Sequence, residues 1–93
     1  MRMNKKEFLK SSGLQVQTLE LWLEQRWLIP EQTSEGARFT DIDVARAQLI
    51  HELKDDLGAN DEGIDVILHL MDQLHEMRRA LARLREDIKG RSF

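Results

Sequence analysis

Cysteine is absent from the 93-residue sequence, and this absence excludes disulfide bridges, thiolate metal sites and cysteine nucleophiles. It also fits the reducing cytoplasm, which is where we expect the protein to be found. Long apolar runs are missing too, because the longest one, from Val66 to Met71, is interrupted by His69. We therefore expect neither a signal peptide nor a membrane-spanning segment.

Patterns typical of enzymes are lacking as well. The sequence contains no glycine-rich phosphate loop and no serine close to a histidine in a recognisable nucleophile pattern. Its histidines, His51, His69 and His75, are too scattered for a metal site with any carboxylate at matching spacing. We expect no catalytic activity, no metal and no cofactor.

Charge is present in abundance, but it is distributed unevenly along the chain. Residues 1–40 carry six bases and five acids, a net charge of +1. Residues 41–76 carry two bases and ten acids, a net charge of −8, and residues 77–93 carry six bases and two acids, a net charge of +4. An acidic middle repels phosphate and attracts a basic partner.

Two short helices joined by a glycine turn are predicted near the N-terminus. Asn4 and Glu7 have the spacing of a capping box that begins the first helix, and Gly13 suits its C-terminal cap. The second helix is expected from about Gln15 to Arg26, and its apolar residues recur at the spacing of one buried face: Val16, Leu19, Leu23 and Trp27. Together the two helices form a helix-turn-helix unit.

A small β-hairpin and a third helix are expected next. Pro30 ends an apolar segment, and the polar, glycine-containing segment up to Arg38 predicts a hairpin with Ile29 and Phe39 turned inward; a plain loop is the alternative. Thr40 then caps a third helix that closes at Gly58. Its first turn carries Asp41 and Asp43, and its predicted buried face consists of Ile42, Ala45, Leu49, Leu53 and Leu57.

A long fourth helix is predicted from Asp61 to Lys89, with Asn60 as its cap. At ~1.5 Å per residue it would be about 43 Å long, which is too long for the head of residues 1–60 to cover. Its start, at Ile64, Leu68 and Met71, is expected to dock on that head within a single domain. From Ile67 onward a heptad pattern predicts a dimer interface formed by Leu70, Leu74, Met77, Leu81, Leu84 and Ile88.

The expected assembly is a homodimer, because leaving the apolar seam in water would be unfavourable. We expect the two helices of residues 61–93 to run antiparallel. In that arrangement the bases of one chain, Arg78, Arg79, Arg83 and Arg85, approach the acids Asp65, Asp72 and Glu76 of the other. A helix folded back on its own head is the alternative.

The predicted elements, in this order, resemble the MerR superfamily over residues 4 to about 90. The resemblance implies an all-α fold, namely a MerR-like winged helix-turn-helix with a small β-hairpin wing and a long C-terminal helix. The matching motifs are GLQVQTL at residues 13–19, WLIP at residues 27–30, Phe39 with Thr40, Asp43 with Val44, and Leu57 with Gly58.

One segment is more specific than the rest. LGANDEGIDVILHLMDQL, residues 57–74, is similar to the chaperone modulator CbpM group, whose members bind the J-domain of the co-chaperone CbpA. The resemblance implies a protein that binds and inhibits the J-domain of a CbpA-type co-chaperone. J-domains carry a basic helix that contacts their seventy-kilodalton chaperone, and this helix is the implied target.

The alternative implied by the superfamily is a DNA-binding transcription regulator, in which Lys5, Lys6, Lys10 and Arg38 contact phosphate. DNA-binding members place Arg-Tyr-Tyr in the second helix, where this chain has Glu20, Leu21 and Trp22. They place Gly-Tyr-Arg in the wing, where only Arg38 remains and tyrosine is replaced by Ala37 or Gly36. Because phosphate neutralisation supplies most non-specific affinity, we expect poor DNA binding.

The expected J-domain contacts are acids near the third-to-fourth helix junction and two side chains of the second helix. A solvated face with ordinary helix capping is the alternative for the acids. Trp22 either contacts the partner beside Leu21 or lies in the core, whereas Trp27 is expected in the core with Leu28 and Ile29. The candidate residues are Asp55, Asp56, Asp61, Glu62, Asp65, Leu21 and Trp22.

Overall fold

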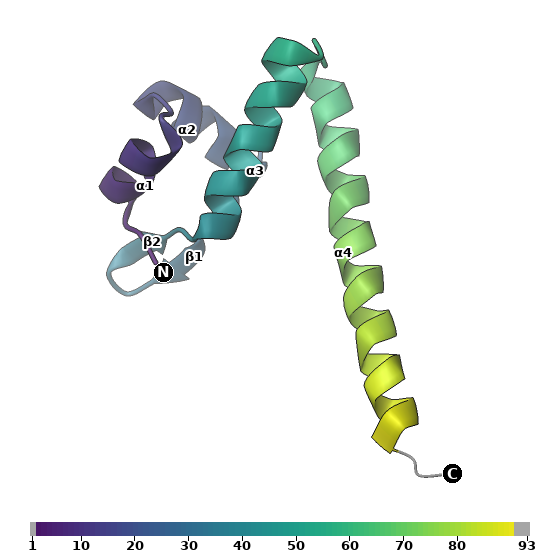
Figure 1. The fold of residues 1–93 in the computed structure, drawn as a ribbon. Helices are drawn as coiled ribbons and strands as arrows, with labels where there is room; N and C mark the ends of the chain where they lie inside the picture. Colours follow the sequence, from purple (N-terminus) through teal and green to yellow (C-terminus); the bar gives the residue numbers. More distant parts are fainter. Residues whose placement is uncertain (1, 91–93) are drawn as a thin grey trace. The chain divides into compact units, whose positions relative to one another are not determined.

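The computed structural model describes residues 2–90 of the chain, which divide into a head, residues 2–60, and a C-terminal helix, residues 61–90 (Figure 1). The described fold is mainly helical but not strictly all-α, because it contains a two-stranded antiparallel hairpin. In chain order the elements are α1 (Lys5–Ser12), α2 (Val16–Glu24), β1 (Glu31–Thr33), β2 (Gly36–Arg38), α3 (Asp41–His51), the π-helical turn η1 (Glu52–Asp56) and α4 (Asp61–Gly90).

The first helix begins and ends where its capping residues predict. The Asn4 side chain accepts a hydrogen bond from the Glu7 amide at 2.8 Å, and the Glu7 carboxylate accepts one from the Asn4 amide at 3.0 Å. The first amides of a helix have no hydrogen-bond acceptor within the helix, and these two side chains supply acceptors for two of the amides at this helix start. Gly13, with φ of +73°, adopts the left-handed conformation that ends the helix, and its amide donates to the Leu9 carbonyl.

The second helix ends in a Schellman motif in which Arg26 takes the place usual for glycine. Arg26 has φ of +62°, and its amide donates to the Leu23 carbonyl at 3.1 Å. The Trp27 amide donates to the Trp22 carbonyl at 2.9 Å. This pair of bonds satisfies carbonyls at the helix end and brings the Trp22 and Trp27 rings together, with centroids 6.2 Å apart.

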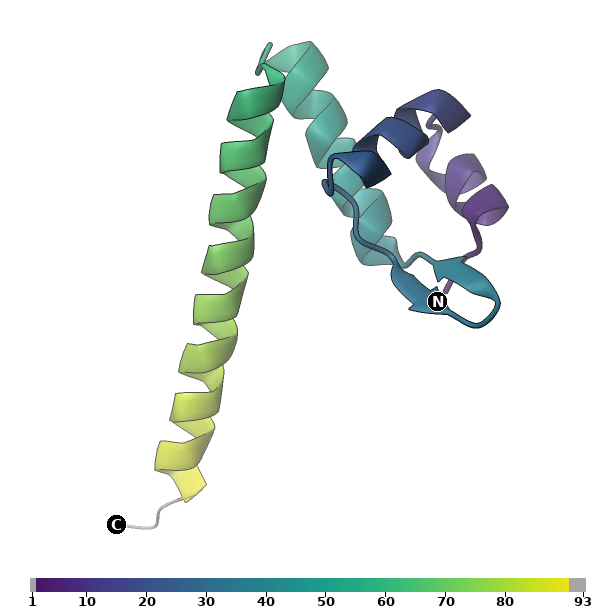
Figure 2. The same cartoon turned by 180° about the vertical axis from the view of Figure 1, so that it is seen from behind.

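The hairpin expected between Pro30 and Arg38 is confirmed, with Glu31 opposite Arg38 and Thr33 opposite Gly36. Met3 extends it by one antiparallel bridge to Phe39, closed by two hydrogen bonds of 2.7 Å. The start of the described chain accordingly lies beside the hairpin in both views (Figures 1 and 2). The Phe39 ring stacks on Phe8 of α1 at a centroid distance of 4.3 Å, which ties the hairpin to the helices.

Ile29 does not turn inward as the sequence predicted, since it is 67 % exposed. The chain leaves α2 through the left-handed Arg26, so that Trp27 and Leu28 enter the core while Ile29 faces solvent. Phe39 is buried as expected. The buried apolar side chains of the head are Met3, Phe8, Leu19, Trp22, Trp27, Leu28, Phe39, Ala47, Ile50 and Leu53.

The predicted start of α3 at Thr40 is confirmed, and the structure adds a capping box there, in which the Thr40 amide donates to the Asp43 carboxylate at 2.9 Å. Its buried face, however, differs from the predicted one. Ile42 is 78 % exposed, whereas Ile50 is fully buried, and Ala47 and Leu53 lie on the same face as Ile50. Among the other residues predicted to be buried, Ala45 and Leu57 are exposed and Leu49 is half-buried. The face is set by neighbouring elements: α1 contacts α3, and Arg46 donates to the Trp27 carbonyl.

The C-terminal helix α4 comprises 30 residues and therefore extends about 45 Å at ~1.5 Å per residue. Its first turn carries Asp61 and Glu62, where the helix dipole favours acids. The six residues of the predicted dimer interface are all exposed. No helix in the described range is both long enough and apolar enough to cross a membrane.

Candidate functional site

The exposed side of α2 is the surface that a helix-turn-helix unit presents to its target. Leu19 and Trp22 are buried on the opposite side of this helix. No lysine or arginine occurs between Val16 and Glu24. We call the exposed side the α2 face, and it consists of Val16, Gln17, Glu20, Leu21 and Glu24.

Trp22 does not belong to the α2 face, so the expectation that it contacts a partner is wrong. Its side chain is 3 % exposed, whereas that of Leu21 is 45 % exposed. Trp22 lies three residues after the buried Leu19 and contacts Trp27 across the Schellman motif. The predicted burial of Val16 is also wrong, because Val16 is more than half exposed. The spacing of Leu19 and Trp22 was the signal for the true buried face.

One base beside the α2 face and one in the hairpin are paired with carboxylates. Lys5 of α1 forms an ion pair with Glu20 of α2. In the hairpin, the Arg38 guanidinium contacts the Glu35 carboxylate at 3.0 Å and also donates to the Ala37 carbonyl at 3.2 Å. Exposed ion pairs of this kind contribute at most about 1 kcal/mol each to stability. Their effect on binding is larger, because each pair cancels a base that phosphate would need.

The two acids of the head that were predicted as partner contacts lie in η1. Asp55 and Asp56 are exposed, and Asp55 contacts His51 Nδ1 at 2.8 Å. The ammonium of Lys54, the residue before Asp55, lies over the Trp27 ring, 5.6 Å from the ring centroid. The outer side of η1 is consequently left with carboxylates.

The acids of the C-terminal helix form a separate group in its first two turns. Asp61, Glu62 and Asp65 are all exposed there. They belong to a different unit from Asp55 and Asp56, although only four residues, 57–60, separate η1 from α4. Each unit by itself therefore presents an accessible acidic group.

Comparison with known proteins agrees with this architecture. A family model described as MerR HTH family regulatory protein matches residues 3–86. The chain belongs to the MerR family. No curated protein and no solved structure was found to match it. The expected resemblance to the MerR superfamily is thus confirmed, and the matched range extends from the Met3 bridge well into α4.

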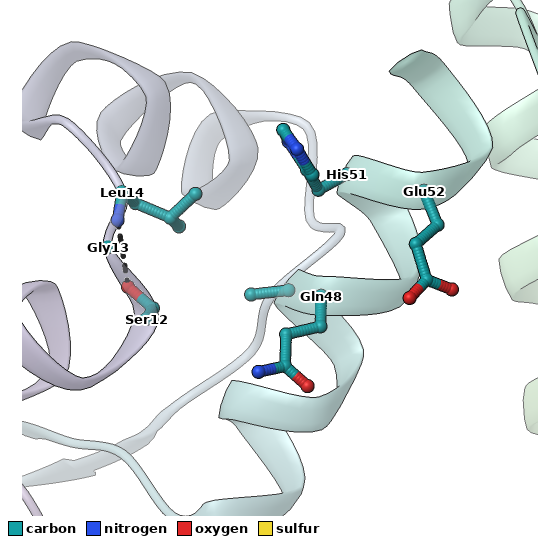
Figure 3. Close-up of a pocket in the computed structure, with 7 residues that line it drawn as sticks. Ser12, Gly13, Leu14, Gln48, His51 and Glu52 are labelled. Atoms are coloured by element: carbon teal, nitrogen blue, oxygen red, sulfur yellow. Dashed lines mark hydrogen bonds between the residues drawn. The ribbon is translucent and has the colours of Figure 1, made fainter. Parts of the chain in front are cut away.

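The head of this MerR-family chain also has a shallow hollow beside the helix-turn-helix turn (Figure 3). The hollow has a volume of about 460 Å³, and it is lined by residues 12–14 on one side and by residues of α3 and the start of η1, among them Gln48 and His51, on the other. The Leu14 amide donates to the Ser12 hydroxyl at 3.2 Å. Within residues 2–90 no buried side-chain nitrogen or oxygen lacks a hydrogen-bond partner, and no group of acids and histidines is suited to a metal. The hollow therefore offers no orphaned polar atom that a ligand would satisfy.

The exposed seam of α4 is the remaining candidate surface of the MerR-family chain. Its leucines and isoleucine recur at heptad spacing over five turns. Charge is divided along the same helix: residues 61–76 carry five acids and no lysine or arginine, and residues 77–90 carry five bases and two acids. The seam residues are about half exposed or more.

Proposed function

We propose that this MerR-family chain is a chaperone modulator that binds the J-domain of a CbpA-type co-chaperone and inhibits it. The observation that carries the proposal is the charge of the helix-turn-helix surface. Where a DNA-binding protein needs free bases, the α2 face has Glu20 and Glu24, and Lys5 and Arg38 are paired with carboxylates. Such a surface repels phosphate and suits a basic protein.

The acids around the η1–α4 junction support the same proposal. A segment with a net charge of −8 and exposed carboxylates on both units attracts a basic helix and accelerates its association. Occupation of the J-domain's basic helix would prevent its contact with the seventy-kilodalton chaperone. Inhibition then follows from competition for one surface.

The alternative is a DNA-binding transcription regulator. It is favoured by the family description as a regulatory protein and by the exposed bases Lys6 and Lys10 on α1. The two functions differ in whether the chain binds generic DNA, and binding that neutralises phosphates is recognised by its steep weakening as salt rises. Gel shifts on generic duplex DNA and calorimetry with a purified J-domain, both at several salt concentrations, separate them. We expect micromolar or tighter J-domain binding and no salt-dependent DNA shift; the reverse result overturns the proposal.

The role of the acids is tested by charge reversal. We expect D55K/D56K, and further addition of E62K, to weaken J-domain binding at least tenfold at moderate salt. The matched control is E86K/D87K, which changes the net charge as much as D55K/D56K but at two exposed acids near the end of α4. Unchanged affinity in the D55K/D56K/E62K variant would remove these acids from the site.

We also propose that the chain is a homodimer held by the α4 seams. An antiparallel pair that sets Met77 opposite the partner's Leu81 also sets Leu74 opposite the partner's Leu84 and Leu70 opposite the partner's Ile88. All six seam residues are then used in six layers, and each buried leucine or isoleucine contributes about 1.5–3 kcal/mol. The arrangement places the acidic half of one helix beside the basic half of the other. Sedimentation at micromolar concentration should give the dimer mass, and a monomer would contradict this assembly.

A further inference from the structure

We infer that the α2 face is the docking surface for a basic amphipathic helix of the protein partner, with Leu21 as the apolar anchor and Glu24 as the pairing carboxylate. This inference rests on the proposed function and specifies which surface of the head holds the partner. The exposed side chains, charges and fixed ends of α2 support it.

Apolar exposure on α2 exceeds what the fold needs. The helix already buries Leu19 and Trp22 in the head, yet Val16 and Leu21 on its other side remain about half exposed. Because Leu21 is not fully buried, a polar residue at position 21 would remove little packing from the head. Leu21 is therefore available to enter an apolar contact with another molecule.

Charge identifies the chemistry of the occupant. The charged residues of the α2 face are both acids, and Glu20 is paired with Lys5 at one edge of the face. Within the described chain the Glu24 carboxylate has no hydrogen-bonding or ionic partner. A partner that covers Leu21 must then bring a lysine or arginine to Glu24, because an apolar cover would leave a desolvated carboxylate unpaired.

The length of α2 indicates the shape of the occupant. Nine residues span about 13 Å at ~1.5 Å per residue, so the face can lie along two to three turns of another helix. A helix satisfies its own backbone groups and presents bases and apolar side chains at the three-to-four spacing of this face. A basic amphipathic helix meets both requirements.

The face is also fixed before binding. The Schellman motif at Arg26 ends α2, and the Trp22–Trp27 contact holds its buried side in the head. The Lys5–Glu20 pair links α2 to α1. A surface on a rigid helix loses little conformational entropy when a partner docks, which favours affinity.

Calorimetry with a purified J-domain of CbpA type tests the inference with two substitutions. We expect L21A and E24K each to raise the Kd about tenfold, as is typical of an anchor or a paired charge at the centre of an interface. The matched controls are I42A, at another exposed aliphatic residue of the head, and E86K, with the same charge change on α4. Both controls should leave the Kd within twofold, and thermal unfolding should show that all four variants fold.

The outcomes separate this inference from the proposed function. If L21A and E24K bind as well as the unsubstituted chain while D55K/D56K does not, the α2 face is not the docking surface and the J-domain function stands. If the unsubstituted chain does not bind the J-domain, both proposals are overturned. Amide shifts of an isotope-labelled chain provide the second readout: on J-domain addition they should concentrate at Gln17, Leu21 and Glu24.

Discussion

Arg26 holds a conformation that side chains other than glycine adopt at a cost. Its φ of +62° lies in the left-handed region, and among the described residues the other positive φ values belong to glycines. The position cannot relax without breaking the bonds from Arg26 to Leu23 and from Trp27 to Trp22. The contact between the two tryptophans thus depends on a strained arginine.

Replacement of Arg26 by glycine should therefore stabilise the head. We expect R26G to raise the free energy of unfolding by about 1 kcal/mol, because glycine adopts positive φ without strain. The preceding residue, Gln25, is right-handed with φ of −72°, so Q25G should lower stability by about 0.5–1 kcal/mol. Urea unfolding followed by tryptophan fluorescence measures both. Equal effects of the two glycines would show that strain at Arg26 is not the cause.

The neighbours Leu21 and Trp22 should respond very differently to truncation. Trp22 is buried, so W22A should lower the free energy of unfolding by about 3–5 kcal/mol, whereas L21A should cost less than about 1 kcal/mol. Scanning calorimetry measures the difference. A small loss of stability for W22A and a large loss for L21A would indicate that Trp22, and not Leu21, is exposed, which is the alternative that the sequence left open.

At the scale of the element, the caps could be predicted but the buried faces could not. The pairs Asn4–Glu7 and Thr40–Asp43 each lie within one helical turn, so their geometry depends only on local sequence. The buried face of α3 depends instead on the approach of α1 and on the Arg46 bond to the Trp27 carbonyl, 19 residues away. Aliphatic residues occur on several sides of α3, and nothing within the helix distinguishes Ile42 from Ile50.

The revised face of α3 gives a direct test. I50A should lower the free energy of unfolding by about 2–5 kcal/mol, because the side chain is fully buried. I42A should change it by no more than about 0.5 kcal/mol, because Ile42 packs against little of the head. Thermal melts of the two variants suffice. A larger loss for I42A would favour the face predicted from the sequence.

At the scale of the whole molecule, the charge distribution was evident from the sequence, whereas its pairing was not. The acids Asp55, Asp56 and Glu62 are exposed, as a charged surface requires. The pairing of Lys5 with Glu20 joins residues 15 apart, which no local pattern reveals. The burial of Trp22 removes the aromatic member of the predicted site, and Leu21 remains as its exposed apolar residue beside the acids.

The antiparallel dimer can be tested with engineered cysteines, since the chain has none of its own. When chains carrying L70C are mixed with chains carrying I88C under oxidising conditions, the proposed register should give a disulfide between unlike chains. In a parallel pair these positions would lie about 27 Å apart along the axis, far beyond the reach of a disulfide. Gel electrophoresis without reductant measures the product. Neither variant should crosslink alone in the antiparallel pair, and efficient crosslinking of L70C alone would indicate the parallel arrangement.

The ion pairs of Lys5 with Glu20 and Arg38 with Glu35 determine how readily the surface charge of the head can change. Each glutamate both adds a negative charge and neutralises a base that the scaffold already presents. Loss of these two carboxylates would therefore release two bases while the stacked Phe8 and Phe39 and the rest of the buried core stayed the same. The charge that this surface carries can therefore change sign through a few substitutions outside the core, and the fold itself places little constraint on that sign.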